Sequence, residues 1–187
     1  MKILHIGSGR KGKDLPILAD YDAEIITLDE DDRLEPDIVC SLGTQAIPLS
    51  DNSIDQVVAW HVLEHIGRQG ETKEWFLFWE EIYRILIPDG QLQFECPLHS
   101  SLWAWSDPSH TRALSPYSFL FFDQDSYRIT GSAITPFRIN CDFKSLGFEG
   151  VADGNEQIKQ QEKVSHFRGV LQARKPLNPW WNSNSHD

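Results

Sequence analysis

A glycine-rich loop near the amino terminus limits the fold more than any other feature of the chain. Residues 3–6 form an apolar run that leads directly into Gly7-Ser8-Gly9-Arg10-Lys11-Gly12, and a second apolar run, 24–28, ends at Asp29. Glycines after a strand let the backbone approach a ligand closely, and an acid about twenty positions later can accept hydrogen bonds from hydroxyl groups. The pattern predicts a parallel α/β sheet with a ligand site at the carboxyl ends of its first strands.

Further apolar runs alternate with helical or loop segments along the chain. Strands are expected at 36–40, 55–60 and 92–96, and Pro16 allows at most a short helix before the second strand. A longer helix is expected at 71–87, where apolar residues recur with helical spacing: Trp75, Trp79, Ile82 and Leu86. A helix at 137–146 and strands at 147–151 and 167–173 complete the expected fold. This order predicts a doubly wound, mostly parallel sheet in a single domain.

The domain is expected to span residues 1–175 and to contain one long insert. Residues 98–136 are rich in aromatic residues, Ser, Pro and Asp without a regular period, which is typical of a functional segment or lid. Residues 176–187 are expected to form an irregular tail. Within that tail, Trp180 and Trp181 could bind a protein partner.

Charge and cysteine content restrict the classes of partner. The net charge is −11, from 28 acidic and 17 basic residues, and the only dense basic run is Arg10, Lys11 and Lys13. Nucleic-acid binding depends on clustered Lys and Arg, so a nucleic-acid target is not expected. The three cysteines have no paired spacing, no apolar run is long enough for a signal peptide or a membrane span, and a cytoplasmic location is expected.

The glycine loop and Asp29 are compatible with two classes of cofactor. A nicotinamide dinucleotide site also needs a helix that begins behind the third glycine, and it needs a second domain to bring the substrate. Pro16 shortens that helix, and no second domain is expected within 187 residues. S-adenosylmethionine (SAM) carries no phosphate and does not need that helix. A nicotinamide-dependent enzyme therefore remains the less favoured alternative.

The rest of the chain resembles a known family. The ordered segments ILHIGSG, IITLDED, PDIVCSLGTQAIPLSDNSIDQVVAWHVLEHI and RILIPDGQLQFECP, within residues 2–97, are similar to SAM-dependent class I methyltransferases, in particular small methyltransferase-domain proteins of bacterial and phage type. Two positions depart from the family pattern, because His5 and Ser41 stand where acids are usual. A third departure is mild, since Pro88-Asp89-Gly90 replaces a Pro-Gly-Gly turn. These departures leave open a catalytically silent module that keeps the fold for binding or assembly.

The resemblance implies a set of cofactor-binding residues. Gly7, Ser8 and Gly9 would line the methionine part of SAM, and Asp29 would accept the ribose hydroxyls with Glu30 beside it. The adenine would be bordered by Ser41 and Leu42, and the sulfonium by Trp60 and His61.

The resemblance also places the acceptor side in the insert, which follows the fifth strand. His61 would face the substrate, while His110 and Asp107 would supply a base. Arg112 would bind an anionic group, and Trp103 and Trp105 would form an aromatic platform. Asp107, His110 and Arg112 could instead belong to a loop held by an internal Asp–Arg pair. Trp103 and Trp105 could instead be core residues. No metal is expected, because His61 and His65 have suitable spacing but no third ligand is evident.

These observations lead to one functional expectation. The chain would transfer the methyl group of SAM to a small-molecule, sugar or other non-basic acceptor. A nucleic-acid methyltransferase is disfavoured by the charge and by the sequence Ala59-Trp60-His61-Val62 after the fourth strand, which lacks an Asn/Asp-Pro-Pro-Tyr/Phe motif.

Overall fold

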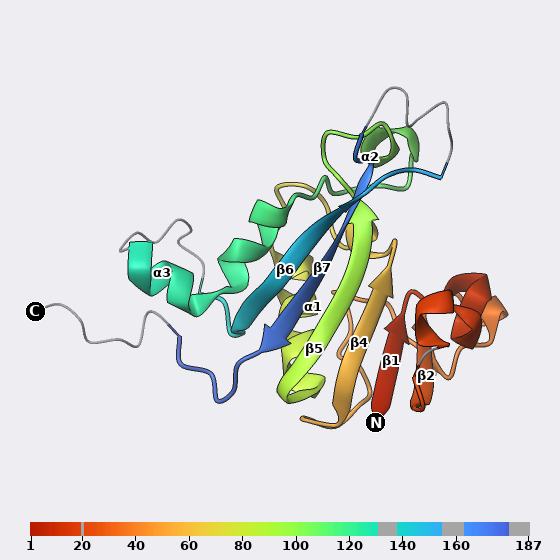
Figure 1. Cartoon of the computed structure of the whole chain (residues 1–187). Coiled ribbons are helices and arrows are strands. Elements are labelled where there is room, and N and C mark those ends of the chain that lie inside the picture. Colours follow the sequence, from red (N-terminus) through yellow and green to blue (C-terminus); the bar gives the residue numbers. More distant parts are fainter. Residues whose placement is uncertain (20, 131–137, 155–162, 180–187) are drawn as a thin grey trace, which may run out of the picture.

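The computed structural model describes residues 1–19, 21–130, 138–154 and 163–179. The two tail tryptophans, Trp180 and Trp181, lie outside the described residues, so their expected role stays a prediction. Within the described residues, seven strands form one sheet: β1 (Lys2–Ile6), β2 (Glu24–Asp29), β3 (Ile38–Val39), β4 (Ile54–Trp60), β5 (Leu86–Pro97), β6 (Phe143–Val151) and β7 (His166–Ala173). Their order in the sheet is β3-β2-β1-β4-β5-β7-β6 (Figure 1).

The sheet is mostly parallel, as expected. Strands β1 to β5 pair in parallel, and β7 runs antiparallel to both β5 and β6. The order reverses beside β1, since β1 has β2 on one side and β4 on the other. Open sheets bind ligands at such a reversal, beyond the carboxyl ends of the strands. The predicted fold class is therefore confirmed. A ligand site is expected at the carboxyl ends of β1, β2 and β4.

One face of the sheet packs against helix α1 (Lys73–Ile85), which lies behind the sheet in Figure 1. This helix was expected at 71–87, and its apolar side, including Trp75, Phe78, Trp79 and Ile82, is buried as predicted. The strands present Leu4, Val57, Leu92, Phe94 and Leu171 to the same core. The insert closes this core from the side, because Phe119 and Phe122 stack on Phe94 and Trp79, with ring centroids 4.5 and 4.4 Å apart.

The opposite face carries only short turns over part of its width. The 3-10 segments η1 (Gly9–Asp14) and η2 (Pro16–Leu18) cover β1 and β4, where Leu15 and Leu18 pack on Ile3 and Val58. On β5 and β7 this face presents polar side chains instead: Gln91, Gln93, Glu95, Arg168 and Gln172. A sheet can leave one face in water when its strands alternate apolar and polar residues, as these two strands do.

The helix expected at 137–146 is absent from the described part of that range. Residues 138–142 have no regular structure, and Phe143 begins strand β6. Ile139, Cys141 and Phe143 are all fully buried, which is the two-residue period of an extended chain. Extended pairing with β7 therefore prevails over helical spacing in this segment.

The remaining described elements are short. Single turns η3 (Asp32–Leu34) and η4 (Leu63–His65) follow β2 and β4. The insert contains α2 (Trp103–Ser106), η5 (Pro116–Phe122) and α3 (Gln124–Thr130). Among the described helices, no stretch has both the length and the apolar character required to cross a bilayer.

Candidate functional site

A cleft of about 310 Å³ lies at the carboxyl ends of β1, β2 and β4. Pockets that bind small ligands usually have volumes of about 300–1,000 Å³. Six of the residues carried over from the family line this cleft: Gly7, Asp29, Glu30, Ser41, Leu42 and His61. Apolar walls come from Leu28, Cys40 and Ile66, and further polar groups from Thr44, His65 and Glu74. The fold therefore brings most of the predicted cofactor side into one cavity.

The glycine loop is fixed by its own backbone and by Asp29. Gly7 has φ +57°, and a Cβ atom there would lie 2.5 Å from Val62 Cγ2, so this position requires glycine. Gly9 also has a positive φ, but a Cβ atom there would meet nothing within 4 Å. The Gly9 N–H donates to Asp29 Oδ2 (2.8 Å), and the Asp31 N–H donates to Oδ1 (3.1 Å). Each carboxylate oxygen of Asp29 keeps a further lone pair for a hydroxyl donor.

His5 and Ser41, which replace the usual acids, have defined partners. His5 donates from Nδ1 to the Gly12 carbonyl (2.7 Å) and so holds the end of the loop. Burial lowers the pKa of His5, against the opposing effects of Gly12 and Asp29. The Ser41 hydroxyl donates to Glu30 Oε2 (3.2 Å), which fixes a carboxylate beside Ser41 at the edge of the cleft. An acid that follows β2 therefore lies beside Ser41.

Three of the expected cofactor residues do not line the cleft: Ser8, Gly9 and Trp60. Successive side chains of a strand alternate between faces, and Ala59 faces the α1 core. Trp60 consequently packs on the opposite face, where the Arg168 guanidinium lies 5.3 Å from its ring. Ser8 is buried, and its N–H donates to the Leu28 carbonyl (3.1 Å). Trp60 and Ser8 were both expected beside the cofactor, and the structure places both outside the lining of the cleft.

His61 lies at the end of β4 and links two buried carboxylates. Its Nδ1 is 3.5 Å from Glu64 Oε1, and its Nε2 is 3.3 Å from Glu95 Oε1. Burial by itself lowers the pKa of His61, but the contacts with Glu64 and Glu95 outweigh it and raise the pKa to about 9. The His61 ring is 42% exposed, so it is available to a ligand at the mouth of the cleft.

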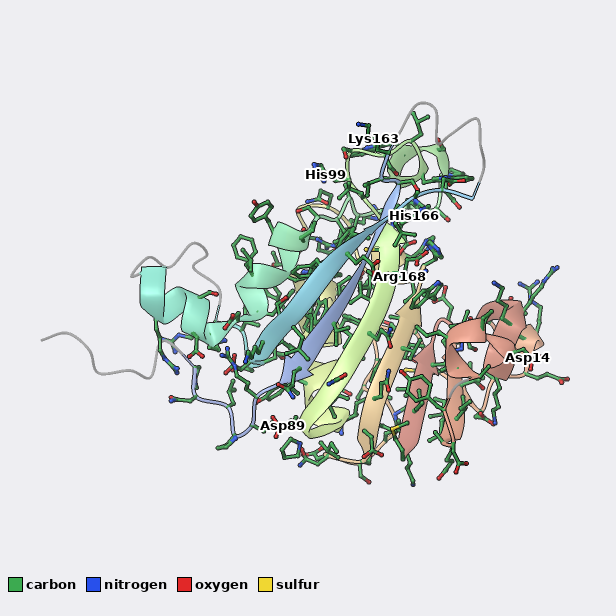
Figure 2. All side chains as sticks on the ribbon, viewed as in Figure 1. Asp14, Asp89, His99, Lys163, His166 and Arg168 are labelled. Atoms are coloured by element: carbon green, nitrogen blue, oxygen red, sulfur yellow. The ribbon has the colours of Figure 1, made fainter. Side chains whose placement is uncertain are left out.

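A second group of residues adjoins His61 from the ends of β5 and β7. Arg168 Nε donates to Glu95 Oε2 (2.6 Å), and the His166 ring contacts the His61 ring edge-on, with centroids 5.1 Å apart. His166 Nδ1 lies 2.8 Å from Ser165 Oγ. Burial lowers the pKa of His166, and the neighbouring His61 lowers it further. Figure 2 labels His166 and Arg168 at the end of the sheet where β5 terminates.

Glu95, His166 and Arg168 were not predicted from the sequence to lie beside His61. They come together because the antiparallel register pairs Glu95 with Arg168 and Pro97 with His166. A strand-end position is the one signal that the sequence offers for them. Trp103 lies beside these residues, since its ring is 6.4 Å from that of His166 and its Nε1 donates to Asp153.

Arg112 and Trp105 do not reach the site, contrary to expectation. The Arg112 guanidinium donates to the carbonyls of Ile66, Arg68 and Glu71 and lies 4.4 Å from the Trp75 ring. These hydrogen bonds hold the insert against the loop after β4. The guanidinium of Arg112 is therefore bound to backbone carbonyls and not directed at an anion in the cleft. Trp105 is 71% exposed and donates to the His99 carbonyl (2.9 Å).

His110 and Asp107 lie next to the cleft, on the Glu64 side. His110 Nε2 is 3.9 Å from both Glu64 Oε1 and Asp107 Oδ2, and its side chain is only 9% exposed. The other oxygen of Asp107 accepts from the N–H and the hydroxyl of Ser109, which lowers the pKa of Asp107. The insert thus brings His110 to the same carboxylate as His61. This arrangement also brings one nitrogen or oxygen ligand atom from each of Glu64, His65 and His110 within 4.8 Å of one another.

Comparisons with known proteins agree with this geometry. Residues 4–94 match the methyltransferase domain family. No curated protein matches the sequence.

Solved structures with the same fold extend the likeness to nearly the whole chain. A SAM-dependent methyltransferase from Archaeoglobus fulgidus has a TM-score of 0.59 at 20% identity, over 91% of this chain and 85% of that one. One from Methanosarcina mazei has a TM-score of 0.60 at 15% identity, over 92% of both chains. The 1,6-didemethyltoxoflavin-N1-methyltransferase of Burkholderia thailandensis has a TM-score of 0.56 at 12% identity, over 93% of this chain and 71% of that one. The sheet order and these structures show that the chain has the fold of class I SAM-dependent methyltransferases, and residues 4–94 match the methyltransferase domain family.

Proposed function

We propose that this chain transfers the methyl group of SAM to a small-molecule, sugar or other non-basic acceptor. The observation that carries the proposal is the single cleft in which Gly7, Asp29 and His61 meet at the carboxyl ends of three adjacent strands. The fold resembles that of the Burkholderia enzyme, which was solved with 1,6-didemethyltoxoflavin and S-adenosylhomocysteine. A small heterocycle bound to a relative supports a small-molecule acceptor for this chain.

The residues of the cleft fit SAM in chemistry as well as in position. Asp29 retains acceptor capacity on both oxygens for the two ribose hydroxyls. Leu28, Leu42 and Ile66 offer apolar surface to the adenine, with Glu30 and Ser41 at its edge. When bound, SAM supplies an activated methyl group on its sulfonium sulfur for in-line displacement. Gly9 leaves open space beside the loop that would hold the methionine part, because a Cβ atom there would meet nothing within 4 Å.

The acceptor would bind between the ends of β4, β5 and β7. His61 stands at the junction of this region with the cleft, and Glu95 and Arg168 hold a fixed charge pair beside it. His166 is the candidate base, because its pKa is lowered and Ser165 holds its Nδ1. Trp103 would close the region from the insert. Orientation of the acceptor against the methyl group is the main catalytic task of these residues.

Calorimetric titration with SAM and S-adenosylhomocysteine tests the cofactor side. Asp29→Ala should weaken binding by about 1.5–3 kcal/mol, the range for hydrogen bonds to a charged group. The neighbouring Asp32→Ala, outside the cleft, should leave the affinity unchanged. His166→Gln should keep the affinity for SAM but lower the rate of S-adenosylhomocysteine formation by roughly 10²–10⁴ with a small-molecule acceptor found by screening.

The outcomes separate the alternatives. A wild-type protein that gives neither heat nor a thermal shift with millimolar SAM would contradict the proposal and would leave a fold kept for binding or assembly. Binding of a nicotinamide dinucleotide in place of SAM would favour the other cofactor class. That class is disfavoured because a 3-10 turn broken at Gly12 (φ +50°), and not a helix, follows the glycine loop.

A further inference from the structure

Three side chains beside the cleft form what we call the Glu64 cluster: Glu64, His65 and His110. Glu64 and His65 belong to the turn η4 after β4, and His110 comes from the insert after β5. Each residue has a ligand atom within 4.8 Å of those of the other two. The rings of His65 and His110 contact edge-on, with centroids 4.9 Å apart. Segments far apart in the sequence thus converge on one point.

Glu64 is buried, and its charge is only partly compensated by His61, whose Nδ1 lies 3.5 Å from Oε1. Its side chain is 2% exposed, and neither carboxylate oxygen has a hydrogen-bond partner within the part of the chain that the structure describes. The nearest imidazole nitrogens, on His61 and His110, are 3.5 and 3.9 Å from Oε1. Charge-assisted hydrogen bonds are about 2.7–2.9 Å long. A desolvated carboxylate is costly unless a cation or hydrogen bonds stabilise it, so this site favours a bound cation.

One histidine of the cluster, His65, is oriented so that its Nε2 offers a lone pair. His65 Nδ1 lies 3.1 Å from the Ser109 carbonyl oxygen, which can only accept, so Nδ1 carries the proton and Nε2 the lone pair. Histidines that bind metals usually donate their other ring N–H to a carbonyl or carboxylate in this way. His110 Nδ1 is buried and has no hydrogen-bond partner among the described residues. Asp107 Oδ2 lies 3.9 Å from His110 Nε2, beyond the cluster.

From this geometry we propose that the Glu64 cluster binds a divalent transition-metal ion, with Zn²⁺ as the best match. Two imidazole nitrogens and one carboxylate oxygen form a ligand set that zinc accepts, and zinc sites with three protein ligands keep one position open. His65 also lines the cleft, so the open position would face the ligand cavity. If the proposed methyl transfer holds, this position would bind an oxygen or nitrogen atom of the acceptor. The metal site itself does not depend on that reaction.

Metal titration of the full-length, untagged protein tests the inference. Wild-type protein is expected to bind one Zn²⁺ per chain by calorimetry, and one Co²⁺ with visible absorption bands typical of tetrahedral coordination. Glu64→Gln and His110→Ala should each weaken binding by more than the roughly 10–100-fold that loss of an outer-shell partner costs. His99→Ala, an exposed histidine of the same insert labelled in Figure 2, should bind as wild type does.

The result that would overturn the inference is equal affinity for Zn²⁺ in wild type, Glu64→Gln and His110→Ala, or no binding by folded wild-type protein. Circular dichroism checks that each variant is folded, and Glu64→Gln preserves the shape of the side chain if His110→Ala does not fold. A parallel SAM titration in the presence of a chelator separates the two proposals. SAM binding without metal would support the methyltransferase proposal whatever the zinc result.

Discussion

His61 ends β4 with a φ of 54°, in the left-handed region that most side chains avoid. Its N–H donates to the Glu95 carbonyl (2.9 Å), and its ring contacts Glu64 and Glu95. Backbone conformations of this kind persist where the surrounding structure enforces them, and they gather at functional sites. The positive φ of His61 therefore lowers the free energy of unfolding, and the surrounding contacts hold the residue in this conformation at the mouth of the cleft.

This loss of stability is measurable by comparing two substitutions that both remove the imidazole. His61→Gly should be more stable than His61→Ala by about 1 kcal/mol in urea denaturation, because only glycine adopts a positive φ without steric penalty. Gln93 in the middle of β5 provides the control, since Gln93→Gly should be less stable than Gln93→Ala. Equal stabilities for the two His61 variants would show that the φ of this residue relaxes when the ring is lost.

At the scale of single residues, chemical type was predictable but orientation was not. Asp29 could be assigned because an acid at the end of the second strand must lie near the glycine loop in a parallel sheet. Arg112 was assigned to an anion because of its charge, yet its guanidinium binds three backbone carbonyls. Sequence alone does not reveal which buried carbonyls need a donor, so the sequence could not identify this role.

Among the elements, the loop between β1 and η1 makes the clearest prediction. Gly7→Ala should lose at least about 2 kcal/mol of unfolding free energy, because the new Cβ would both strain φ and contact Val62 at 2.5 Å. Gly9→Ala should lose only the backbone term of about 1–2 kcal/mol. Gly9→Val should keep its circular dichroism spectrum and lose SAM binding, since its side chain would enter open space beside the loop.

Val62 provides an internal check on the Gly7 prediction. Gly7→Ala should cost less in a Val62→Ala background, because the shortened side chain removes Cγ2, the atom that the new Cβ would approach to 2.5 Å, and leaves only Val62 Cβ at 2.8 Å. Strictly additive effects would show that the γ-methyl groups of Val62 are not the source of the cost. Loss of the folded signal in Gly9→Val would show that Gly9 serves the turn and not the cofactor.

The spacing of apolar residues predicted most helices and strands. It gave the wrong element where a short apolar run fits both the helical and the extended period. The helix predicted at 71–87 is α1 because its apolar residues recur every three or four positions over several turns. In 137–146 the short run of Ile139, Cys141 and Phe143 fits both helical and extended spacing over so few residues. Only the pairing of Phe143 with Ala173 decides in favour of a strand, and such a partner is not visible in the local sequence.

For the molecule as a whole, the charge of −11 predicts weak interaction with nucleic acids. Duplex DNA and RNA should not bind measurably at physiological salt, because the basic residues are few and their one dense run lies in η1. Fluorescence anisotropy with labelled duplexes measures this directly, with an acidic protein of similar charge as the reference. Submicromolar binding that falls steeply with salt would contradict the proposed class of acceptor but not the fold.

The candidate site divides into a part that the sequence predicts and a part that it does not. The cofactor side depends on consecutive parallel strands, whose ends necessarily share one edge of the sheet. The side formed by Glu95, His166 and Arg168 depends on the antiparallel register of a strand that follows some seventy residues later in the chain. Loop lengths between β5 and β7 do not determine that register, so these residues could be recognised only in the folded chain.

The position of β7 between β5 and β6 has a consequence for synthesis on the ribosome. Strand β6 is made before β7, yet in the described part of the chain it joins the sheet through its pairing with β7 alone. The residues up to β5 can pack around α1 while the chain is still growing, since domains begin to fold from the amino terminus during synthesis. Strand β6 must wait unpaired until Ala173 has left the exit tunnel. A nascent chain stalled before β7 would therefore carry the cleft at the ends of β1, β2 and β4 but lack His166 and Arg168.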